Sequence, residues 1–298
     1  MRDAAVSPAS SRSRKTPAAE PTSSIGRAGT LTVHYKCQDA RTVFGRTNCQ
    51  TPWHLLPPIY LDDSGAAYTL LVNPSGGLVG GDHLSIDMHL DPSAHVLIST
   101  PSANRVYRSL AKESRQEIQI RLGAGAVLEW FPEHTIPFAG SRFRQHVDVK
   151  LGKNAIVLFW DAVASGRIAS GERWAFTSLH NEIRITTAAG SCLLERYALV
   201  PKRGGIGLAA EWDYVASLFI VGDGVEEDVW NRLESALAVI LDERPGRLLG
   251  GVTRPGIPGV AVKLLARSAP DLTAGCDALW HEARRILLGM PAVSWRKY

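Results

Sequence analysis

The feature that most limits the fold of this chain is an internal repeat. Three copies match closely and a fourth matches less well: residues 86–98, 118–130, 147–159 and 183–195. Each copy opens with alternating apolar and polar residues, which is the pattern of a half-buried strand. A turn containing Gly, Pro, Asn or Asp follows, and then a small residue and, in the three close copies, a second apolar stretch. One such unit cannot bury its own apolar face, whereas stacked units can.

The repeat therefore predicts a mainly β fold built as an elongated, solenoid-like stack of β-hairpins. A plain β-sandwich, in which repeated hairpins are common, is the alternative on the residues alone. The last third of the chain changes period. Residues near 225–242 and 272–288 are predicted to form two C-terminal α-helices, because the apolar residues of each fall on one helical stripe. Gly259–Arg267, between them, is predicted to be a strand.

The domain organisation is simple. Residues 1–24 are mostly Ala, Ser, Pro and Thr, so we expect a disordered N-terminal extension. Residues 25–298 are expected to form a single β-rich domain. No apolar run approaches the roughly 18 residues of a membrane span, so a membrane protein is not expected. The net charge is only +4, without a Lys/Arg run, which argues against nucleic acid as a partner. The four cysteines are scattered and form no C-x-x-C pair, which indicates reduced thiols and a cytoplasmic protein.

A glycine-rich loop occupies residues 73–82. It lacks the Lys and Ser/Thr that a phosphate-binding loop needs, because Asp82 and a histidine follow its last glycine. Tight turns with positive φ explain some of the glycines. Four glycines around one aspartate exceed what a turn needs, so we expect the backbone to be crowded around Asp82. These glycines are Gly76, Gly77, Gly80 and Gly81.

Acidic residues stand out at two further places. Glu133 and His134 are adjacent, and they could share one ion only at a bend, which Pro132 makes plausible. The alternative is an exposed acid beside a half-buried histidine. Asp161 ends a strongly apolar strand, so it is either a turn residue or lies at a polar opening in the core.

Other residue patterns argue against an enzyme. His83, His89 and His95 recur every six residues, but six strand residues span about 20 Å, so His83 and His89 cannot bind one ion within a straight strand. We take that spacing as chance. The chain contains neither a G-x-S-x-G nucleophile motif nor an H-E-x-x-H zinc motif.

Several residues are candidates for contact with a protein partner. Arg105, Tyr107 and Arg108 lie in a polar segment after an apolar strand, and Arg and Tyr are enriched at protein interfaces. Arg167 is a further candidate, and it could form an ion pair of little energetic weight with Glu172. The alternative for these residues is an ordinary solvated surface loop.

Taken in order, these stretches resemble the UreD (UreH) family of urease accessory proteins. The similarity runs from about Leu31 to the end of the chain. The family's N-P-x-G-G-x-x-G-G-D motif is found at Asn73–Asp82, and its T-P-x-x-x-x-x-Y-R-S motif at Thr100–Ser109. Its E-W-x-P-x-x-T-I motif is found at Glu129–Ile136, and its G-R-x-x-x-G-E motif at Gly166–Glu172. The family's C-terminal helix ending in Gly-x-Pro resembles Ala283–Pro291.

The resemblance implies two long β-sheets in a helical, solenoid-like stack with a small helical portion. It also implies a urease maturation factor that is not an enzyme. Such a protein would be a scaffold and nickel conduit that, with a UreF-like protein and a UreG-like GTPase, helps to deliver nickel into the urease apoprotein. It would bind no cofactor tightly, and Ni²⁺ would only pass through.

The resemblance also implies a polar internal passage for nickel. Asp82 and Asp161 are the best candidates for it, followed by Glu133, His134 and Glu195. Carboxylates suit transit, because hard oxygen ligands bind Ni²⁺ less tightly than thiolate or imidazole sets. This chain departs from the family pattern at His134 and at Ala139, where an acid is frequent. Two other functions remain open: a metal-dependent hydrolase, which needs three clustered ligands and an open position, and a purely structural interaction module.

Overall fold

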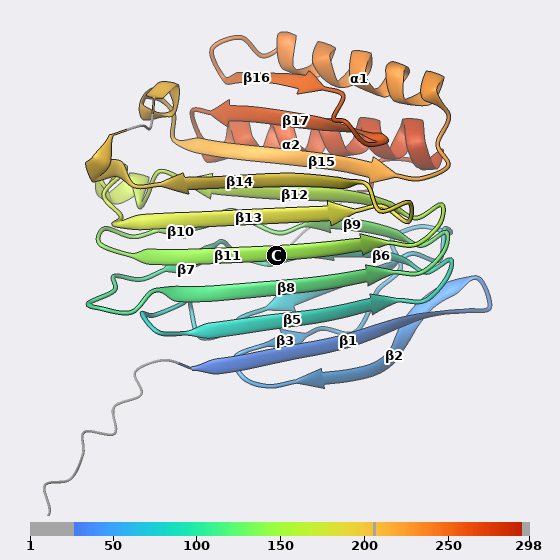
Figure 1. Cartoon of the computed structure of the whole chain (residues 1–298), viewed down its shortest axis with the longest axis horizontal. Coiled ribbons are helices and arrows are strands. Elements are labelled where there is room, and N and C mark those ends of the chain that lie inside the picture. The colour runs from blue at the N-terminus through green and yellow to red at the C-terminus, as the bar shows by residue number, and fades with distance from the viewer. Residues whose placement is uncertain (1–26, 205–206, 294–298) are drawn as a thin grey trace, which may run out of the picture.

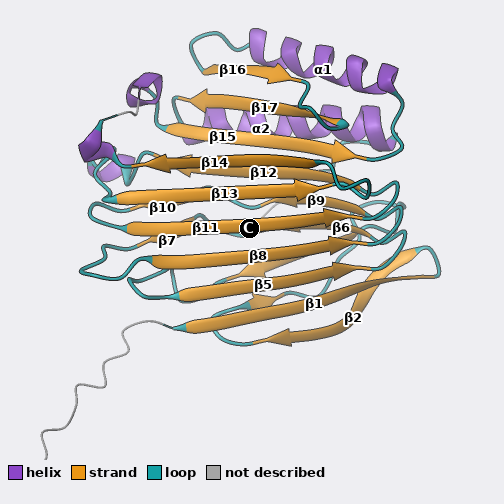
Figure 2. Ribbon diagram, viewed as in Figure 1, coloured by secondary structure: helices purple, strands orange, loops and turns teal. Residues whose placement is uncertain are grey.

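The computed structural model describes residues 27–204 and 207–293, and the extension predicted to be disordered, residues 1–24, lies outside them. Two β-sheets face each other, and two helices cover the outer face of the larger sheet at its C-terminal end (Figure 1, Figure 2). One apolar core fills the space between the sheets, and a second lies between the larger sheet and the helices. The molecule therefore has three layers: sheet, sheet and helices.

The smaller sheet has seven strands. Neighbouring strands in its centre are parallel, and one antiparallel strand closes each edge. In spatial order the strands are β14 (Cys192–Leu199), β13 (Ser178–Thr186), β11 (Arg142–Leu151), β8 (Ser114–Leu122), β5 (His83–Leu90), β1 (Ala28–Gln38) and β2 (Arg41–Cys49).

The larger sheet has ten strands. In spatial order its main path contains β16 (Leu248–Thr253), β17 (Gly259–Ala266), β15 (Tyr214–Gly222), β12 (Ile156–Ala164), β9 (Val127–Phe131), β6 (His95–Ser99), β4 (Ala67–Val72) and β3 (His54–Leu55). Two short strands lie off this path, β7 (Asn104–Val106) and β10 (Thr135–Pro137), and β10 pairs with both β7 and β12. Strands β4, β6, β9 and β12 are parallel, whereas β15, β17 and β16 continue the sheet in antiparallel pairs.

The sequence repeat is the repeat of the fold. Its first three copies correspond to β5–β6, β8–β9 and β11–β12, and their first residues stand in register, with Ile118 opposite both Ile86 and Val147. The first strand of each copy lies in the smaller sheet and the second in the larger sheet. The two strands of a copy are therefore not paired as a hairpin: each pairs with the equivalent strand of the next copy, so each copy is one coil of a solenoid. The weaker fourth copy differs, because β13 and β14 do form an antiparallel hairpin.

The turns inside the coils explain the small residue of each copy. Ala94, Ala126 and Ala155 are fully buried at the same point of successive coils. Each follows a residue with positive φ: Ser93, Gly125 and Asn154. Gly123 lies where successive turns meet, and a Cβ atom there would stand 2.5 Å from the backbone nitrogen of Pro92. The prediction of a mainly β, solenoid-like fold with two long sheets and two C-terminal helices is confirmed.

The helices lie near the predicted places. Helix α1 (Glu227–Asp242) buries Trp230, Leu233, Leu237 and Leu241. Helix α2 (Ala269–Ala283) begins before residue 272 because the Ser268 hydroxyl accepts a hydrogen bond from the backbone N–H of Asp271, at 3.2 Å, and caps the helix. A π-helical turn continues α2. This turn spans Arg284–Leu288. Short 3₁₀ helices span Ile168–Ser170, Pro201–Arg203 and Gly207–Glu211.

The structure bears on two expectations, that the chain does not span a membrane and that its cysteines are reduced. In the part of the chain that the structure describes, no helix combines the length and the apolar character needed to cross a bilayer. All four cysteines lie in that part, and they are free thiols.

Candidate functional site

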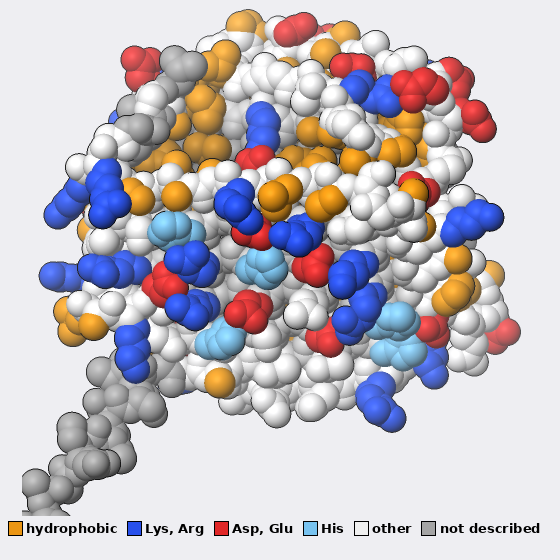
Figure 3. All heavy atoms as spheres, in the orientation of Figure 1, with side chains coloured by type: hydrophobic (Ala, Val, Ile, Leu, Met, Phe, Trp, Pro, Cys, Tyr) orange, Lys and Arg blue, Asp and Glu red, His pale blue; other side chains and the backbone are white. Residues whose placement is uncertain are grey.

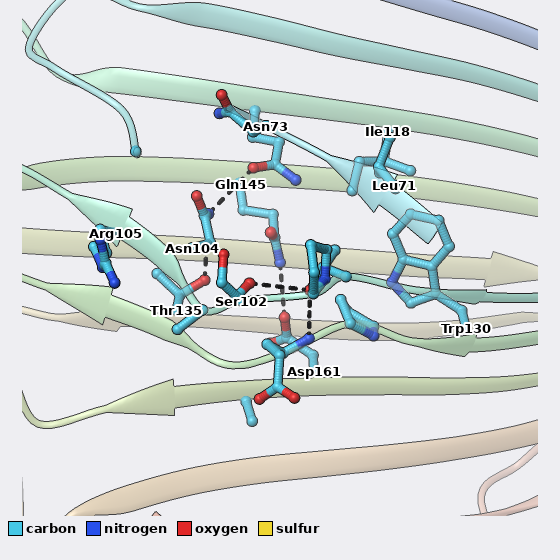
Figure 4. A pocket seen from close by; sticks show the side chains of 18 of the residues that line it. Leu71, Asn73, Ser102, Asn104, Arg105, Ile118, Trp130, Thr135, Gln145 and Asp161 are labelled. Atoms are coloured by element: carbon cyan, nitrogen blue, oxygen red, sulfur yellow. Dashed lines mark hydrogen bonds between the residues drawn. The ribbon is translucent and has the colours of Figure 1, made fainter. Parts of the chain in front are cut away.

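A cavity with both polar and apolar walls lies between the two sheets (Figure 4). Its walls include exposed residues of the glycine loop and of the loop after β6, so the cavity reaches the surface there. Trp130 and Phe159, stacked at a centroid distance of 5.8 Å, form part of its apolar wall. Its polar lining consists of Asn73, Thr100, Ser102, Asn104, Arg105, Gln116, Glu133, Thr135, Gln145 and Asp161.

Asp161 and Glu133 are the two carboxylates of this polar lining. Asp161 lies on β12 in the larger sheet and points toward Gln145 on β11 of the facing sheet (Figure 4). Gln145 Nε2 donates to its Oδ1 at 2.9 Å, and Asn181 Nδ2 donates to its Oδ2 at 2.7 Å. The Tyr197 hydroxyl is 3.5 Å from the same Oδ2. These three donors are neutral, and all come from the smaller sheet.

The environment of Asp161 disfavours its charged form. Burial between the sheets raises the pKa of this carboxyl, although the hydrogen bonds from Gln145 and Asn181 and the charge of Lys263 act in the opposite direction. The side chain is nevertheless partly accessible, because it faces the cavity. A cation that entered the cavity would therefore find a carboxylate whose direct partners carry no charge.

Glu133 lies at the boundary between this cavity and a second one. It follows β9, where its backbone N–H donates to the Thr100 hydroxyl at 2.8 Å. Its carboxylate is 3.6 Å from His134 Nδ1, so the two side chains are neighbours, as a bend after Pro132 permits. The His134 ring also packs edge-on against Tyr214 at a centroid distance of 5.1 Å. Glu133 lines both cavities.

The second cavity is a groove on the other side of the larger sheet, along α2. Besides Glu133 and His134 it contains three side chains from α2 that can bind a metal ion: Cys276, Asp277 and His281. The sequence assigned no role to these three residues. Pro101, Ser102, Ala103, Pro132 and Glu133 line both the groove and the cavity between the sheets.

Glu195 differs from Asp161 because it is paired with a cation. Its carboxylate accepts a hydrogen bond from the Lys263 ammonium, which joins β14 of the smaller sheet to β17 of the larger sheet. The same ammonium donates to the Ser217 hydroxyl at 3.0 Å. The charges of Asp161 and Glu195 both act on the Tyr197 hydroxyl, so the structure places the two carboxylates in one polar region.

Asp82 lies in the glycine loop, and neither cavity is lined by it. It is buried, and its carboxylate accepts backbone N–H groups from Arg27 at 2.8 Å and from Val79 at 2.9 Å. A Cβ atom on Gly77 would stand 2.4 Å from the carbonyl oxygen of Arg105, and one on Gly80 would stand 2.6 Å from the Ser109 hydroxyl. Gly76 and Gly81 have positive φ. In this structure the aspartate and the glycines hold the loop against its neighbours.

The residues predicted to contact a partner come together at one end of the sheets. The Phe138 ring lies between Tyr107, at a centroid distance of 4.9 Å, and the Arg167 guanidinium, at 4.5 Å. Arg167 also forms a two-pronged ion pair with Glu172, whose carboxylate accepts the backbone N–H of Ala139 at 3.1 Å. The side chain of Arg108 packs against Gly140 nearby, and Arg105 lines the cavity.

Sequence reasoning missed the amides around Asp161. Gln145 and Asn181 occupy inward positions of strands whose other inward residues, such as Phe143 and Ile183, are apolar. An amide at a buried position of a period-2 pattern was therefore the signal that could have identified them. The hydroxyl of Tyr197 gave no such signal.

Comparison with known proteins gives one family. Residues 27–297 match the family model described as UreD urease accessory protein. Urease accessory protein UreD 2 of Streptomyces griseus is 30% identical over 283 residues, which cover 92% of this chain and 95% of the relative. Urease accessory protein UreD of Microcystis aeruginosa is 34% identical over 268 residues, or 89% of this chain and 96% of the relative. That of Delftia acidovorans is 37% identical over 259 residues, or 81% and 84%. The family match spans every element that lines the two cavities.

Proposed function

Because this chain belongs to the UreD family of urease accessory proteins, we propose that it is a non-catalytic urease maturation factor that conducts Ni²⁺ toward the urease apoprotein. In this proposal it acts in the cytoplasm as a scaffold, together with a UreF-like protein and a UreG-like GTPase. Ni²⁺ is its cargo, and it keeps no tightly bound cofactor. The free thiols agree with a reducing compartment.

The observation that carries the proposal is the environment of Asp161. Its direct hydrogen-bond donors are Gln145, Asn181 and Tyr197, which are neutral, and Lys263, which acts on it electrostatically, is paired with Glu195. A carboxylate enclosed between two sheets is poorly compensated by such partners. A divalent cation in the cavity would compensate it. Oxygen and amide ligands would also let Ni²⁺ leave again, which a conduit requires.

The position of Glu133 supports a path for the route. This carboxylate lines the cavity between the sheets and also the groove along α2, where His134, Asp277 and His281 lie. In the proposal, Ni²⁺ moves from Asp161 past Glu133 into this groove, or in the reverse direction. Glu195 takes part less directly, because Lys263 already neutralises it.

The test is urease activity in cells that carry a complete urease gene cluster from which this coding sequence has been deleted. We expect activity to be lost and then restored by the parent chain. Asp161→Asn keeps the size of the side chain, and we expect it to restore little activity and little nickel in the purified urease. The matched control is Asp148→Asn on the outer face of β11, which should restore both.

Two results would contradict the proposal. Full urease activity without this chain would refute a role in maturation. Full activity and nickel content with Asp161→Asn would exclude the role as a conduit and leave the role as a scaffold, provided that circular dichroism shows both variants to be folded.

A further inference from the structure

Two histidines stand side by side on the outer face of the smaller sheet. His34 on β1 and His89 on β5 are directly opposite each other in the parallel pairing of these strands. Figure 3 shows this face, where histidine, basic and acidic side chains intermingle over the parallel strands. The inward neighbours, Val33 and Met88, belong to the core between the sheets, so both imidazoles point away from the cavity described above.

A carboxylate completes the group. Asp91 follows the end of β5, and its Oδ1 is 2.6 Å from His34 Nε2 and 3.5 Å from His89 Nε2. The two ring centroids are 4.9 Å apart. One ligand atom from each residue lies within 4.8 Å of the others, and among the described residues this is the one such group of three His, Cys, Asp or Glu side chains.

These separations are close to those around a bound metal ion. Metal–nitrogen and metal–oxygen bonds of about 2.0–2.2 Å put neighbouring ligand atoms roughly 3 to 3.5 Å apart. Small rotations of the side chains would therefore bring all three atoms onto one ion. The remaining positions of that ion would face water, because the three side chains are between 29% and 45% exposed.

The backbone holds the three residues where they are. Parallel pairing fixes His34 beside His89, and the N–H of Asp91 donates to the carbonyl oxygen of Tyr35 at 2.9 Å. The residue opposite His89 on the next strand, β8, is Arg121, and its guanidinium is bound by Asp87 at 2.6 Å. A cation at the histidine pair is therefore not opposed by a free arginine.

We propose that His34, His89 and Asp91 form a surface site for one divalent first-row transition-metal ion such as Ni²⁺ or Zn²⁺. Two imidazoles and one carboxylate suit these ions, whereas Mg²⁺ and Ca²⁺ prefer sets of oxygen ligands. The site is separate from the cavity between the sheets, and it stands whether or not that cavity conducts nickel.

The test is Ni²⁺ and Zn²⁺ binding to the full chain by isothermal titration calorimetry and equilibrium dialysis. His89→Ala should lose one bound ion per chain, or weaken its binding about tenfold or more. His83→Ala is the matched control. His83 lies on the same face of the same strand, its side chain is 49% exposed against 45% for His89, and it also has an acidic neighbour, Glu117, at 3.2 Å. It lacks a second histidine, so its loss should change nothing.

A spectroscopic measurement identifies the ligands. Cu²⁺ bound to the parent chain at one equivalent should give an electron paramagnetic resonance spectrum with coupling to two imidazole nitrogens, and His34→Ala or His89→Ala should remove it. Equal metal binding in His89→Ala and the parent would overturn the proposal, as would an equal loss in His83→Ala. A change confined to Asp161→Asn would assign the bound metal to the interior instead.

Discussion

Glu129 and Arg284 form a buried ion pair that joins β9 to the turn after α2 across 155 residues of chain. Both side chains are at most 1% exposed. The other carboxylate oxygen accepts the indole N–H of Trp280 at 2.5 Å, and Arg284 also reaches Asp62 at 3.2 Å. His95 Nε2 also lies 2.7 Å from the Glu129 carboxylate, so Glu129 has two ionisable partners, and Arg284 is the one that is always charged.

Arg284→Met should lower the free energy of unfolding by about 3–5 kcal/mol, because it removes the guanidinium and leaves His95 as the remaining ion-pair partner of the buried Glu129. Arg285→Met is the control. This neighbour is exposed and pairs with Glu282 at the surface, so its loss should change stability by less than about 1 kcal/mol. Urea denaturation of the two variants measures the difference, and equal effects would show that the buried pair is not needed for stability.

The same carboxylate predicts a loss of stability in acid. Burial opposes the ionisation of Glu129, yet the hydrogen bond and charge of His95 and the charge of Arg284 hold its pKa below the usual 4.5. A lowered pKa in the folded state stabilises the fold above the unfolded value, and this contribution disappears as pH falls through the folded value. The free energy of unfolding should therefore decrease below about pH 4.5. Urea denaturation at several pH values should give a shallower decrease for Glu129→Gln than for the parent, and an identical slope would count against this account.

Gly123→Ala should destabilise the stacked coils. Its Cβ atom would stand 2.5 Å from the backbone nitrogen of Pro92 and 2.8 Å from the carbonyl carbon of Asp91, neither of which is a flexible side-chain end. We expect a loss of about 1–3 kcal/mol in the free energy of unfolding. Gly251→Ala on β16 is the control, because nothing lies within 4 Å of its Cβ position. Thermal unfolding should leave the control near the parent, and a stable Gly123→Ala would mean that the turns can separate.

Arg167→Gln tests the predicted partner surface. Its ion pair with Glu172 is exposed, so stability should change by less than about 1 kcal/mol. If this end of the sheets meets the UreF-like protein, co-purification with that protein should fall. Arg173→Gln is a matched control, because Arg173 is also 43% exposed and pairs with another acid, Asp213. Equal recovery of the partner by both variants would remove Arg167 from the interface.

A second measurement tests the same surface. The chain expressed alone should be poorly soluble, because a partner surface left uncovered promotes association. Co-expression with a UreF-like protein should raise the soluble yield, and less so for Arg167→Gln than for Arg173→Gln. A soluble yield that does not change on co-expression would contradict the expected partnership.

The sequence predicted the coils better than their pairing. Alternation and a recurring small residue are local features, and they are the same in a hairpin and in a coil of a solenoid. The hydrogen-bond partner of Ile118 lies in the next copy, about 30 residues away. Nothing within one copy distinguishes that partner from the strand that follows in the chain. The family resemblance, rather than the repeat, implied two long sheets.

For the same reason, only part of the candidate site could be predicted from the sequence. Asp161 could be identified from its own position, since it follows a strongly apolar run, although it does not end the strand as predicted: β12 continues to Ala164. Its amide donors and the partner of Glu129 come from other strands or from the C-terminal turn, and only the fold brings them together. The six-residue spacing of His83 and His89 along one strand did not predict the histidine pair of the structure. The imidazole beside His89 belongs to His34, on the neighbouring strand.

The distance between Glu129 and Arg284 along the chain also sets a time during synthesis. A ribosome adds about 5–20 residues per second, so the 155 residues that separate the two take roughly 8 to 30 s to make. Each coil needs only the following coil to pair its strands, and it can form early. Glu129 cannot form its ion pair with Arg284 until nearly all of the remaining chain has been made. For much of that interval, until α1 (Glu227–Asp242) and then α2 (Ala269–Ala283) are made, the outer face of the larger sheet has no helices over it, and its apolar side chains are exposed to aggregation.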